Sequence, residues 1–323
     1  MSTASHEPVI DARELHKSFG NVEAVKSLSF SVEAGEVLGL LGPNGAGKTT
    51  TIKMLTTLTQ IDGGQAAIGG FDVSTQPDVV RQMIGVAGQS AAVDEKLTAR
   101  ENLNLFGRLY KIPRAERQRR TEELIERFDL GDFADRPSST YSGGERRRLD
   151  VVAALVANPP ALFLDEPTTG LDPRSRAELW DTVRSLATEG TAIVLSTQYL
   201  EEADRLADKI LLIDHGEVVA QGTPDALKAN LDRNVLEIHL ELESGVGDAQ
   251  ELLASEENAV ADVEARRIDI HVGNDADRSL ALLRRLQDGG ISILKFQLRE
   301  PTLDDVFLSL TGSPSTEIEE STK

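Results

Sequence analysis

Short apolar runs and amphipathic stretches alternate along the first two thirds of the chain. Residues 37–41 form a continuous apolar run, which is typical of a strand buried on both faces of a sheet. Residues 161–164, 192–196 and 210–213 predict further buried strands of the same kind. A helical pattern at residues 174–186 separates the first two of these strands. This alternation of strands and helices predicts an α/β fold with a parallel sheet.

Other segments of the same region have different patterns. Residues 9–15 and 28–32 predict two strands near the N-terminus. Residues 101–110 and 114–128 repeat apolar side chains at helical spacing, with charged residues between them. The stretch from about residue 90 to residue 155 therefore predicts a helical subdomain within the α/β unit.

A boundary between two domains is predicted at Gly222-Thr223-Pro224, where turn-forming residues cluster. It divides the chain into a first domain, residues 1–225, and an extension, residues 226–323. Patterns in the extension follow the order βαββαβ, which suggests a small α+β module of the ferredoxin-like kind. The polar tail, residues 312–323, predicts a frayed end.

Composition narrows the class of protein. The chain has 323 residues and a formal net charge of −20, from 34 Lys and Arg against 54 Asp and Glu. This acidity argues against a nucleic-acid partner, because phosphate backbones bind basic surfaces. The absence of cysteine excludes disulfides, thiol catalysis and Cys-based metal sites. No apolar run is long enough to span a bilayer and no secretory signal is evident, so we expect a cytoplasmic protein.

The acidic charge is not spread evenly. It is denser in residues 226–323 than in the rest of the chain, and Arg outnumbers Lys in the chain as a whole. Two interpretations stay open. The carboxylates form an ordinary solvated surface, or they are an adaptation to high salt, where dense carboxylates keep a protein hydrated.

The strongest chemical signal is a glycine-rich loop between a predicted buried strand and a predicted helix. Its glycines allow backbone N–H groups to point at one phosphate, and the helix adds its positive N-terminal end. Lys48 is predicted to reach the β- and γ-phosphates, and the Thr49 hydroxyl to bind Mg²⁺. The predicted ATP-binding residues of this segment are Gly42, Pro43, Asn44, Gly45, Ala46, Gly47, Lys48, Thr49 and Thr50.

An acidic pair follows the apolar run at residues 161–164. Asp165 and Glu166 are predicted to lie at the carboxyl edge of the sheet, where α/β folds bind ligands. Asp165 is expected to hold Mg²⁺ through water, and Glu166 to act as general base toward the attacking water. Alone, the pair is equally consistent with two acids that cap a strand. Beside a phosphate loop, the catalytic interpretation is favoured.

A third motif identifies a family. Tyr141-Ser142-Gly143-Gly144-Glu145 resembles the signature of ATP-binding cassette (ABC) ATPases, usually written LSGGQ. Tyr141 and Glu145 depart from that pattern. Ser142, Gly143 and Gly144 are intact, and the resemblance implies that they bind the ATP held by a second subunit. With this order of motifs, the resemblance covers about residues 8–225 and implies a P-loop NTPase fold of the ABC type.

Further positions match the same family. The resemblance implies that Phe19 stacks on adenine, although alone it is typical of a core residue. It implies that Gln89 touches Mg²⁺ and links the nucleotide to the helical subdomain, although Gly88 stands where the family usually has Pro. Asp172, in Gly170-Leu171-Asp172, matches the loop that crosses the dimer interface.

One departure concerns the γ-phosphate. Gln198 stands where the family usually has a catalytic histidine. Glutamine donates an amide hydrogen bond but carries no charge. The site is therefore expected to bind ATP, and either turns it over slowly or belongs to a subgroup in which Gln is normal.

Two segments resemble the daunorubicin-type drug-resistance ATPases within this family. They are Arg146-Arg147-Arg148 after the signature, and residues 300–312 near the end of the chain. The alternatives are a solvated helix face for the three arginines and an amphipathic helix that packs on its own module for residues 300–312.

The resemblance implies a head-to-tail homodimer with two ATP molecules at its interface. It also implies separate transmembrane permease subunits, docked on the helical subdomain, so that the protein is peripheral on the inner face of the membrane. The leading hypothesis is the ATP-hydrolysing subunit of a multidrug exporter. A weak-turnover ATP-dependent switch and a soluble ABC ATPase without a transport role are the alternatives.

Overall fold

The computed structural model describes residues 7–89, 92–229, 234–242, 245–253, 259–273 and 275–311. It divides into two compact units, the first ending at Pro224 and the second beginning at Asp225. Each unit is described by itself below. The tail predicted to be frayed, residues 312–323, lies outside the described residues.

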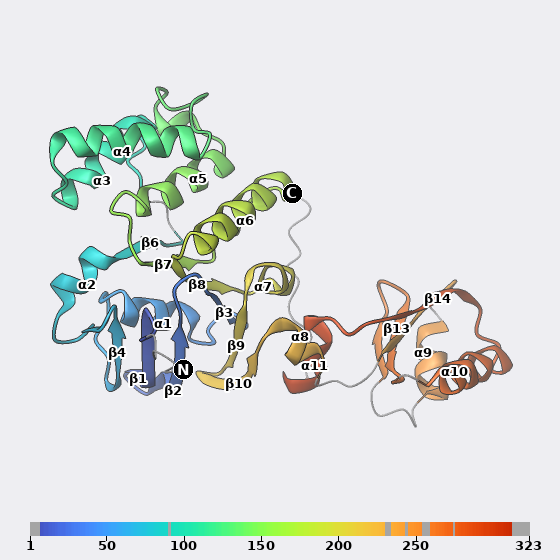
Figure 1. Ribbon diagram of the computed structural model, residues 1–323. Coiled ribbons are helices and arrows are strands. Elements are labelled where there is room, and N and C mark those ends of the chain that lie inside the picture. The colour runs from blue at the N-terminus through green and yellow to red at the C-terminus, as the bar shows by residue number, and fades with distance from the viewer. Residues whose placement is uncertain are drawn as a thin grey trace, which may run out of the picture. The chain divides into compact units, whose positions relative to one another are not determined.

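A six-stranded sheet forms the centre of the first unit (Figure 1). Five neighbouring strands are parallel, which confirms the predicted α/β fold, and only β10 pairs antiparallel. In sheet order the strands are β10 (Glu217–Gly222), β9 (Lys209–Asp214), β3 (Val37–Leu41), β8 (Ala192–Thr197), β7 (Ala161–Asp165) and β6 (Ile84–Ala87).

The sheet is buried on both faces. Leu162 and Leu164 of β7 pack into one hydrophobic cluster, whereas Phe163 between them packs into the other. This alternation follows from the two-residue period of a strand, and it explains why the predicted strands are apolar throughout. The helices on these faces include α1 (Lys48–Leu55), α6 (Pro173–Thr188) and α7 (Leu200–Leu206).

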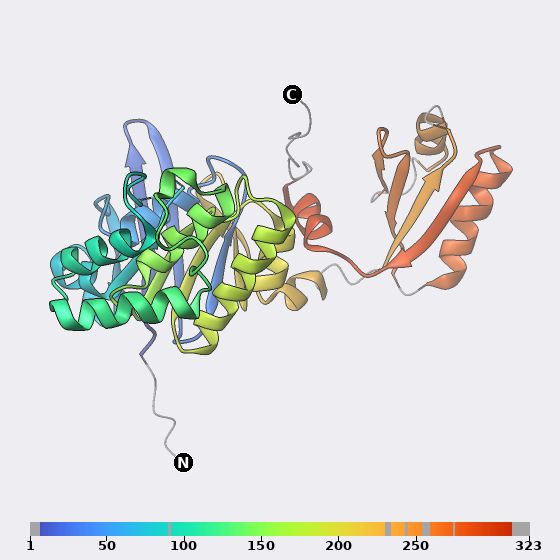
Figure 2. The ribbon, with the colours of Figure 1, turned by 90° about the horizontal axis from the view of Figure 1, so that it is seen from above.

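A second sheet, antiparallel and four-stranded, belongs to the same unit. Its order is β2 (Val22–Val32), β1 (Ile10–Phe19), β4 (Gly63–Ile68) and β5 (Phe71–Asp72). Strands β1 and β2 form the blue hairpin in Figure 2. Both are longer than the sequence predicts, because their outer halves mix charged, polar and apolar residues without a clear strand pattern. Strand β4 was not predicted, because in it two glycines precede only a short apolar end.

Several helices lie in the stretch for which the sequence predicts a helical subdomain, about residues 90–155. This stretch contains α3 (Ala99–Leu109), α4 (Arg114–Arg127) and α5 (Gly143–Ala154), with the short α2 (Pro77–Met83) and the 3₁₀ turn η1 (Ser138–Thr140) nearby. Thr98 begins α3 with a capping box, in which its side chain and that of Glu101 satisfy each other's backbone N–H. Among the described residues, no helix has the length and apolar character needed to cross a bilayer.

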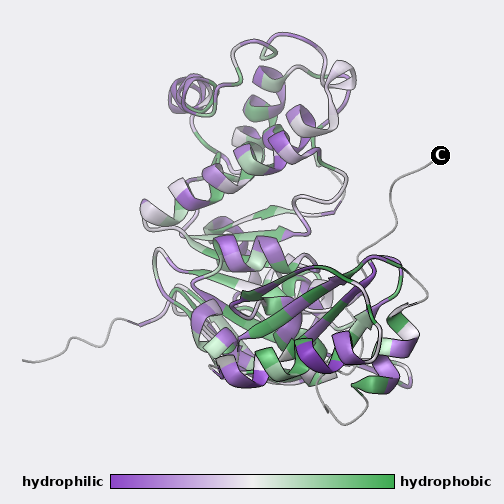
Figure 3. Cartoon of the chain, turned by 90° about the vertical axis from the view of Figure 1, so that its right-hand side faces the viewer, coloured by the Kyte–Doolittle hydropathy of each residue, from purple (hydrophilic) through white to green (hydrophobic). Residues whose placement is uncertain are grey.

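The second unit contains a four-stranded antiparallel sheet in the order β12-β13-β11-β14. Helices α9 and α10 cover one face of it (Figure 2), and their apolar sides join one hydrophobic cluster. The helices alternate between hydrophilic and hydrophobic residues, as helices with one buried face do (Figure 3). Its elements are α8 (Pro224–Ala229), β11 (Val235–Leu240), α9 (Gly245–Leu252), β12 (Ala259–Asp262), β13 (Arg267–His271), α10 (Ala276–Asp288), β14 (Ile293–Arg299) and α11 (Leu303–Thr311).

Candidate functional site

Predicted site residues from four segments converge at one edge of the six-stranded sheet. Gly42 follows β3, Glu166 follows β7, Gln198 follows β8, and Gln89 lies two residues after β6. These four strands are parallel neighbours, so their carboxyl ends meet at the same edge. This is the edge at which open α/β sheets bind ligands.

At two positions the glycine-rich loop lies so close to the backbone of other segments that there is no room for a side chain. A Cβ at Gly42, whose φ is +157°, would come within 2.1 Å of the Ile213 carbonyl oxygen. A Cβ at Gly47, whose φ is +110°, would come within 2.5 Å of the Ala24 carbonyl oxygen. These glycines let the loop curl ahead of α1, which begins at Lys48.

Lys48 is buried at the base of this loop, with 4% of its surface exposed. Its ammonium donates hydrogen bonds to the carbonyl oxygens of Gly42 at 2.6 Å and Pro43 at 3.0 Å. Burial lowers the pKa of Lys48, while the charges of Glu166 and Asp165 act to raise it. The ammonium group of Lys48 is thus held next to the acidic pair, and its Nζ lies 3.9 Å from Oε1 of Glu166.

Oxygen ligands suitable for a hard divalent cation meet at Asp165. Oδ1 of Asp165 accepts a hydrogen bond from the Thr49 hydroxyl at 3.0 Å and another from the Ser196 hydroxyl at 2.5 Å. Carboxylate and hydroxyl oxygens are what Mg²⁺ prefers in proteins. These residues therefore fit a magnesium ion carried by a bound nucleotide.

Glu166 has a fixed backbone in an unusual conformation. Its φ is +48°, in the left-handed region that non-glycine residues seldom adopt. Its N–H donates to the carbonyl oxygen of Ser196 at 3.1 Å and lies at the same distance from that residue's hydroxyl. Strain of this kind is typical of functional sites, and it holds the carboxylate at the sheet edge.

Phe19 is exposed, with 53% of its surface accessible, so the expectation of a core residue from its sequence alone was wrong. It ends β1, and the Lys17 ammonium lies 5.3 Å from its ring centre. The partner strand β2 contains Ala24, whose carbonyl lies against the phosphate loop. An exposed ring at this end of the hairpin is suited to stacking.

The two departures in the signature motif have structural explanations. Tyr141 is buried, and its hydroxyl donates to the Phe133 carbonyl at 2.6 Å and accepts from the Ala99 N–H at 3.2 Å. Glu145 forms a capping box with Ser142, the residue that precedes α5. Burial acts to raise the pKa of Glu145, but its hydrogen bonds with Ser142 and the charge of Arg136 outweigh it and lower that pKa.

The signature lies against the start of α6 in its own chain. A Cβ at Gly144 would come within 2.3 Å of the Ser175 hydroxyl. Asp172 precedes α6 and accepts hydrogen bonds from the Ser175 N–H and hydroxyl. Within the described residues, the hydrogen bonds of Ser142 stay in the first turn of α5 and none reaches the phosphate loop.

The three arginines after the signature are not one solvated face. Arg146 pairs with Glu95 at 2.6 Å, and Arg148 pairs with Glu178. Arg147 is 8% exposed and donates hydrogen bonds to backbone carbonyls. This burial was not predicted from the sequence. The available signal was the helical period, because Val151 and Ala154 follow Arg147 on one face of α5.

The tryptophan of the chain links two helices next to the site. Trp180 of α6 is buried, and its Nε1 donates to Oε1 of Glu202 in α7 at 3.0 Å. Burial raises the pKa of Glu202, and the hydrogen bond from Trp180 opposes that rise. The Arg205 guanidinium lies 5.0 Å from the indole ring centre. The start of α6 at Asp172 and the segment after Gln198 are thereby connected.

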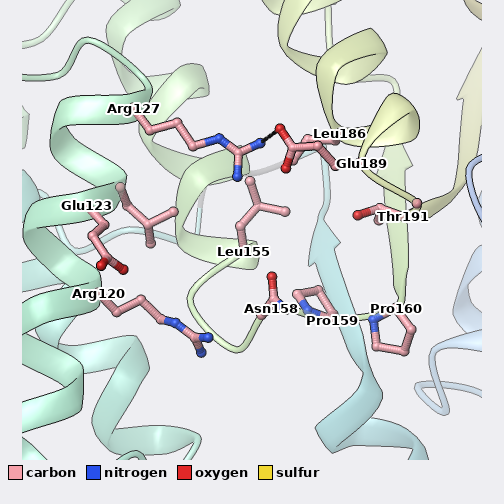
Figure 4. A pocket seen from close by; sticks show the side chains of 12 residues that line it. Arg120, Glu123, Arg127, Leu155, Asn158, Pro159, Pro160, Leu186, Glu189 and Thr191 are labelled. Carbon is pink, nitrogen blue, oxygen red and sulfur yellow. Dashed lines mark hydrogen bonds and ion pairs between the residues drawn. The ribbon is translucent and has the colours of Figure 1, made fainter.

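A cavity of about 420 Å³ lies at the opposite edge of the sheet (Figure 4). Pro160 and Thr191, which line it, directly precede β7 and β8, so it adjoins the amino ends of these strands. An Arg127–Glu189 ion pair joins two of its walls. Strands of five residues span roughly 17 Å, which separates this cavity from the phosphate loop.

The fold and this site together define an ATP-binding cassette ATPase. The family model described as ABC transporter matches residues 25–169, which include the phosphate loop, signature and acidic pair. A second model, described as the C-terminal domain of DrrA1-3-like ATP-binding proteins, matches residues 222–311. The chain belongs to the ABC transporter family and is an ATP-hydrolysing subunit.

Relatives and solved structures agree with this assignment. The daunorubicin/doxorubicin resistance ATP-binding protein DrrA of Streptomyces peucetius is 47% identical over 308 residues, covering 95% of this chain and 93% of the relative. A solved ATP-binding subunit of an ABC transporter is similar with a TM-score of 0.62 and 29% identity, over 69% of this chain and 92% of its own. A dimeric post-hydrolysis structure of the cassette MJ0796, bound to ADP and Pi, has a TM-score of 0.59 and 25% identity, over 66% and 98%.

Proposed function

We propose that this chain drives the efflux of drugs or other hydrophobic compounds through a separate transmembrane permease. The observation that supports this most is the near full-length similarity to the daunorubicin/doxorubicin resistance protein, which includes the C-terminal unit and is not limited to the ATPase motifs. The permease would hold the chain on the inner face of the membrane.

The chemistry follows from the groups at the sheet edge. Lys48 and the loop N–H groups bind the phosphates, with Phe19 on the adenine ring. Thr49, Asp165 and Gln89 would hold Mg²⁺, which when bound would supply positive charge to neutralise the phosphates. Glu166 accepts a proton from the attacking water, and Gln198 donates a hydrogen bond to the γ-phosphate. The Thr49–Asp165 contact supports the metal assignment.

Two copies would complete the site. Ser142, Gly143 and Gly144 of one copy meet the γ-phosphate held by the other, with Asp172 at the interface. The Ser142 hydroxyl accepts a hydrogen bond from the Glu145 N–H, so its own hydrogen can still be donated to an anion from outside, and this supports the arrangement. In this arrangement residues 1–225 form the ATPase domain and residues 226–323 an extension.

Export is tested by expressing the chain in cells with and without the membrane protein encoded beside it. We expect lower accumulation of daunorubicin only when both are present, because the chain alone offers no path across a bilayer. Cells with the Lys48→Met chain and the same membrane protein are the matched control, and they are expected to accumulate as much drug as cells that express neither protein. Equal accumulation in all cells would contradict an export role for these compounds.

Replacing Gln198 with His tests the weak-turnover alternative. A protonated imidazole gives a charge-assisted hydrogen bond, about 1 kcal/mol stronger than that of an amide, so kcat is expected to rise no more than about 10-fold. The gain should be larger at pH 6 than at pH 8, because an imidazole with a pKa near 6.5 loses its charge in between. Phosphate release is measured at both pH values. A rise from near zero would instead support a switch.

A further inference from the structure

Arg147 differs from the arginines on either side of it. Arg146 and Arg148 form ion pairs with glutamates, and their side chains keep 31% and 21% of their surface in solvent. Arg147 points inward from the first turns of α5 and is 8% exposed. A buried guanidinium is costly unless its donors are satisfied, so its partners show what it holds.

Its guanidinium holds three backbone carbonyls from two segments of the candidate site. Nε donates to the Pro167 oxygen at 2.8 Å, and Nη2 donates to the Asp165 oxygen at 3.2 Å. These two residues flank Glu166. Nη1 donates to the Gly88 oxygen, directly before Gln89. One rigid planar group thus joins the acidic pair to the glutamine segment.

Asp150, one turn further along α5, holds the other side of that segment. It is 2% exposed, and its Oδ1 accepts a hydrogen bond from the Ala92 N–H at 2.6 Å. Its Oδ2 lies 3.4 Å from Nη1 of Arg147. Gly88 and Ala92, on either side of the short segment that begins with Gln89, are therefore both bound to the helix that follows the signature.

The charges of this arrangement support each other. Burial lowers the pKa of Arg147, and the negative charges of Asp150, Asp165 and Glu202 oppose that shift. Burial raises the pKa of Asp150, opposed by the Ala92 hydrogen bond and by Arg147. Replacing Arg147 and Asp150 by apolar residues would remove the burial cost. It would also remove the hydrogen bonds that these two side chains make to the backbone segments.

We propose that Arg147 and Asp150 are positioning residues, which fix Gln89 relative to Asp165 and Glu166 and so tie the signature helix to the magnesium–nucleotide site. The inference rests on the proposed roles of Gln89 and Asp165 as magnesium ligands. Arg147 and Asp150 would act through these backbone hydrogen bonds and not as magnesium ligands themselves. A movement of α5 would be passed directly to the segments that bear these ligands.

The test uses Arg147→Gln in the full chain, with Arg146→Gln as the matched control on the adjacent, ion-paired position. A fluorescent ATP analogue is titrated in EDTA and in Mg²⁺. For Arg147→Gln we expect unchanged affinity in EDTA, a loss of about 10- to 100-fold in the tightening that Mg²⁺ causes, and a similar fall in kcat, as for other residues that orient metal ligands. Arg146→Gln should match the original chain in its affinity in EDTA, in the tightening that Mg²⁺ causes and in kcat.

Two further variants keep the inference testable. Arg147→Lys should not restore Mg²⁺ dependence, because an ammonium lacks the planar fork that reaches three carbonyls. Asp150→Asn keeps the acceptor for Ala92 but removes the charge beside Arg147, so it should show a smaller loss in the same direction. If Arg147→Gln does not fold, Asp150→Asn alone decides.

The proposed clamp, formed by Arg147 and Asp150, is contradicted if Arg147→Gln or Asp150→Asn lowers the melting temperature while the effect of Mg²⁺ on nucleotide affinity is unchanged. Gln89→Ala separates this outcome from a failure of the proposed site. If Gln89→Ala loses Mg²⁺ dependence and Arg147→Gln keeps it, the clamp alone is wrong. If Gln89→Ala keeps Mg²⁺ dependence, the magnesium role of Gln89 is wrong, and the clamp with it.

Discussion

Glu166→Gln is expected to lower kcat for ATP hydrolysis by about 10²- to 10⁴-fold, the usual contribution of a general base. The amide has the size of the carboxylate but cannot accept the proton of the attacking water. The backbone should not move, because its position depends on the Glu166 N–H and its bond to Ser196 rather than on the carboxylate.

The variant should still bind MgATP and should accumulate as a dimer with trapped nucleotide. Phosphate release and gel filtration with and without MgATP measure the two effects. Glu123→Gln, on an exposed ion pair of α4, is the matched control and should hydrolyse ATP like the original chain. Normal hydrolysis by Glu166→Gln would show that another group activates the water.

Lys48→Met is expected to raise the dissociation constant for ATP by about 10- to 150-fold, which corresponds to losing about 1.5–3 kcal/mol from a charged hydrogen bond. It should also remove measurable hydrolysis, since the γ-phosphate loses its cation. Methionine has a similar length and no charge, so it separates the ammonium from the space that it fills.

Folding should be much less affected than binding. The substitution leaves the Gly42 and Pro43 carbonyls without their donor, but it also removes a buried charge whose pKa burial already lowers. Calorimetric titration with ATP and a thermal melt check the two quantities. Lys53→Met, on an exposed position of α1, controls for the loss of one lysine from the same helix. Unchanged ATP affinity in Lys48→Met would contradict the phosphate role.

The sequence was sufficient to place the predicted residues at one sheet edge wherever the signal is local or follows from parallel topology. The phosphate loop is one contiguous segment with two glycines whose positions tolerate no side chain. Glu166 and Gln198 each follow an apolar strand, and parallel pairing of those strands brings their ends together. No knowledge of distant contacts was needed for these predictions.

What the sequence could not provide depends on contacts between distant segments. Strand β4 exists because it pairs with β1, and a stretch that starts with Gly63 and Gly64 has no intrinsic strand pattern. Phenylalanine is usually a core residue, and Phe19 is exposed because it lies at the end of the hairpin. The role of Arg147 depends on the carbonyl oxygens of Gly88 and Asp165. Every residue has a backbone carbonyl, so a sequence does not indicate which of them a side chain will bind.

The position of Trp180 gives the chain an intrinsic optical reporter. The sequence contains one tryptophan, so tryptophan fluorescence comes from a single known place between α6 and α7. Its ring is buried, with the Arg205 guanidinium 5.0 Å from the ring centre, and its Nε1 donates a hydrogen bond to Glu202, which follows Gln198 in sequence. A change in that emission on adding nucleotide would report the movement of these two helices in the unlabelled chain, on the time scale of a stopped-flow mixer.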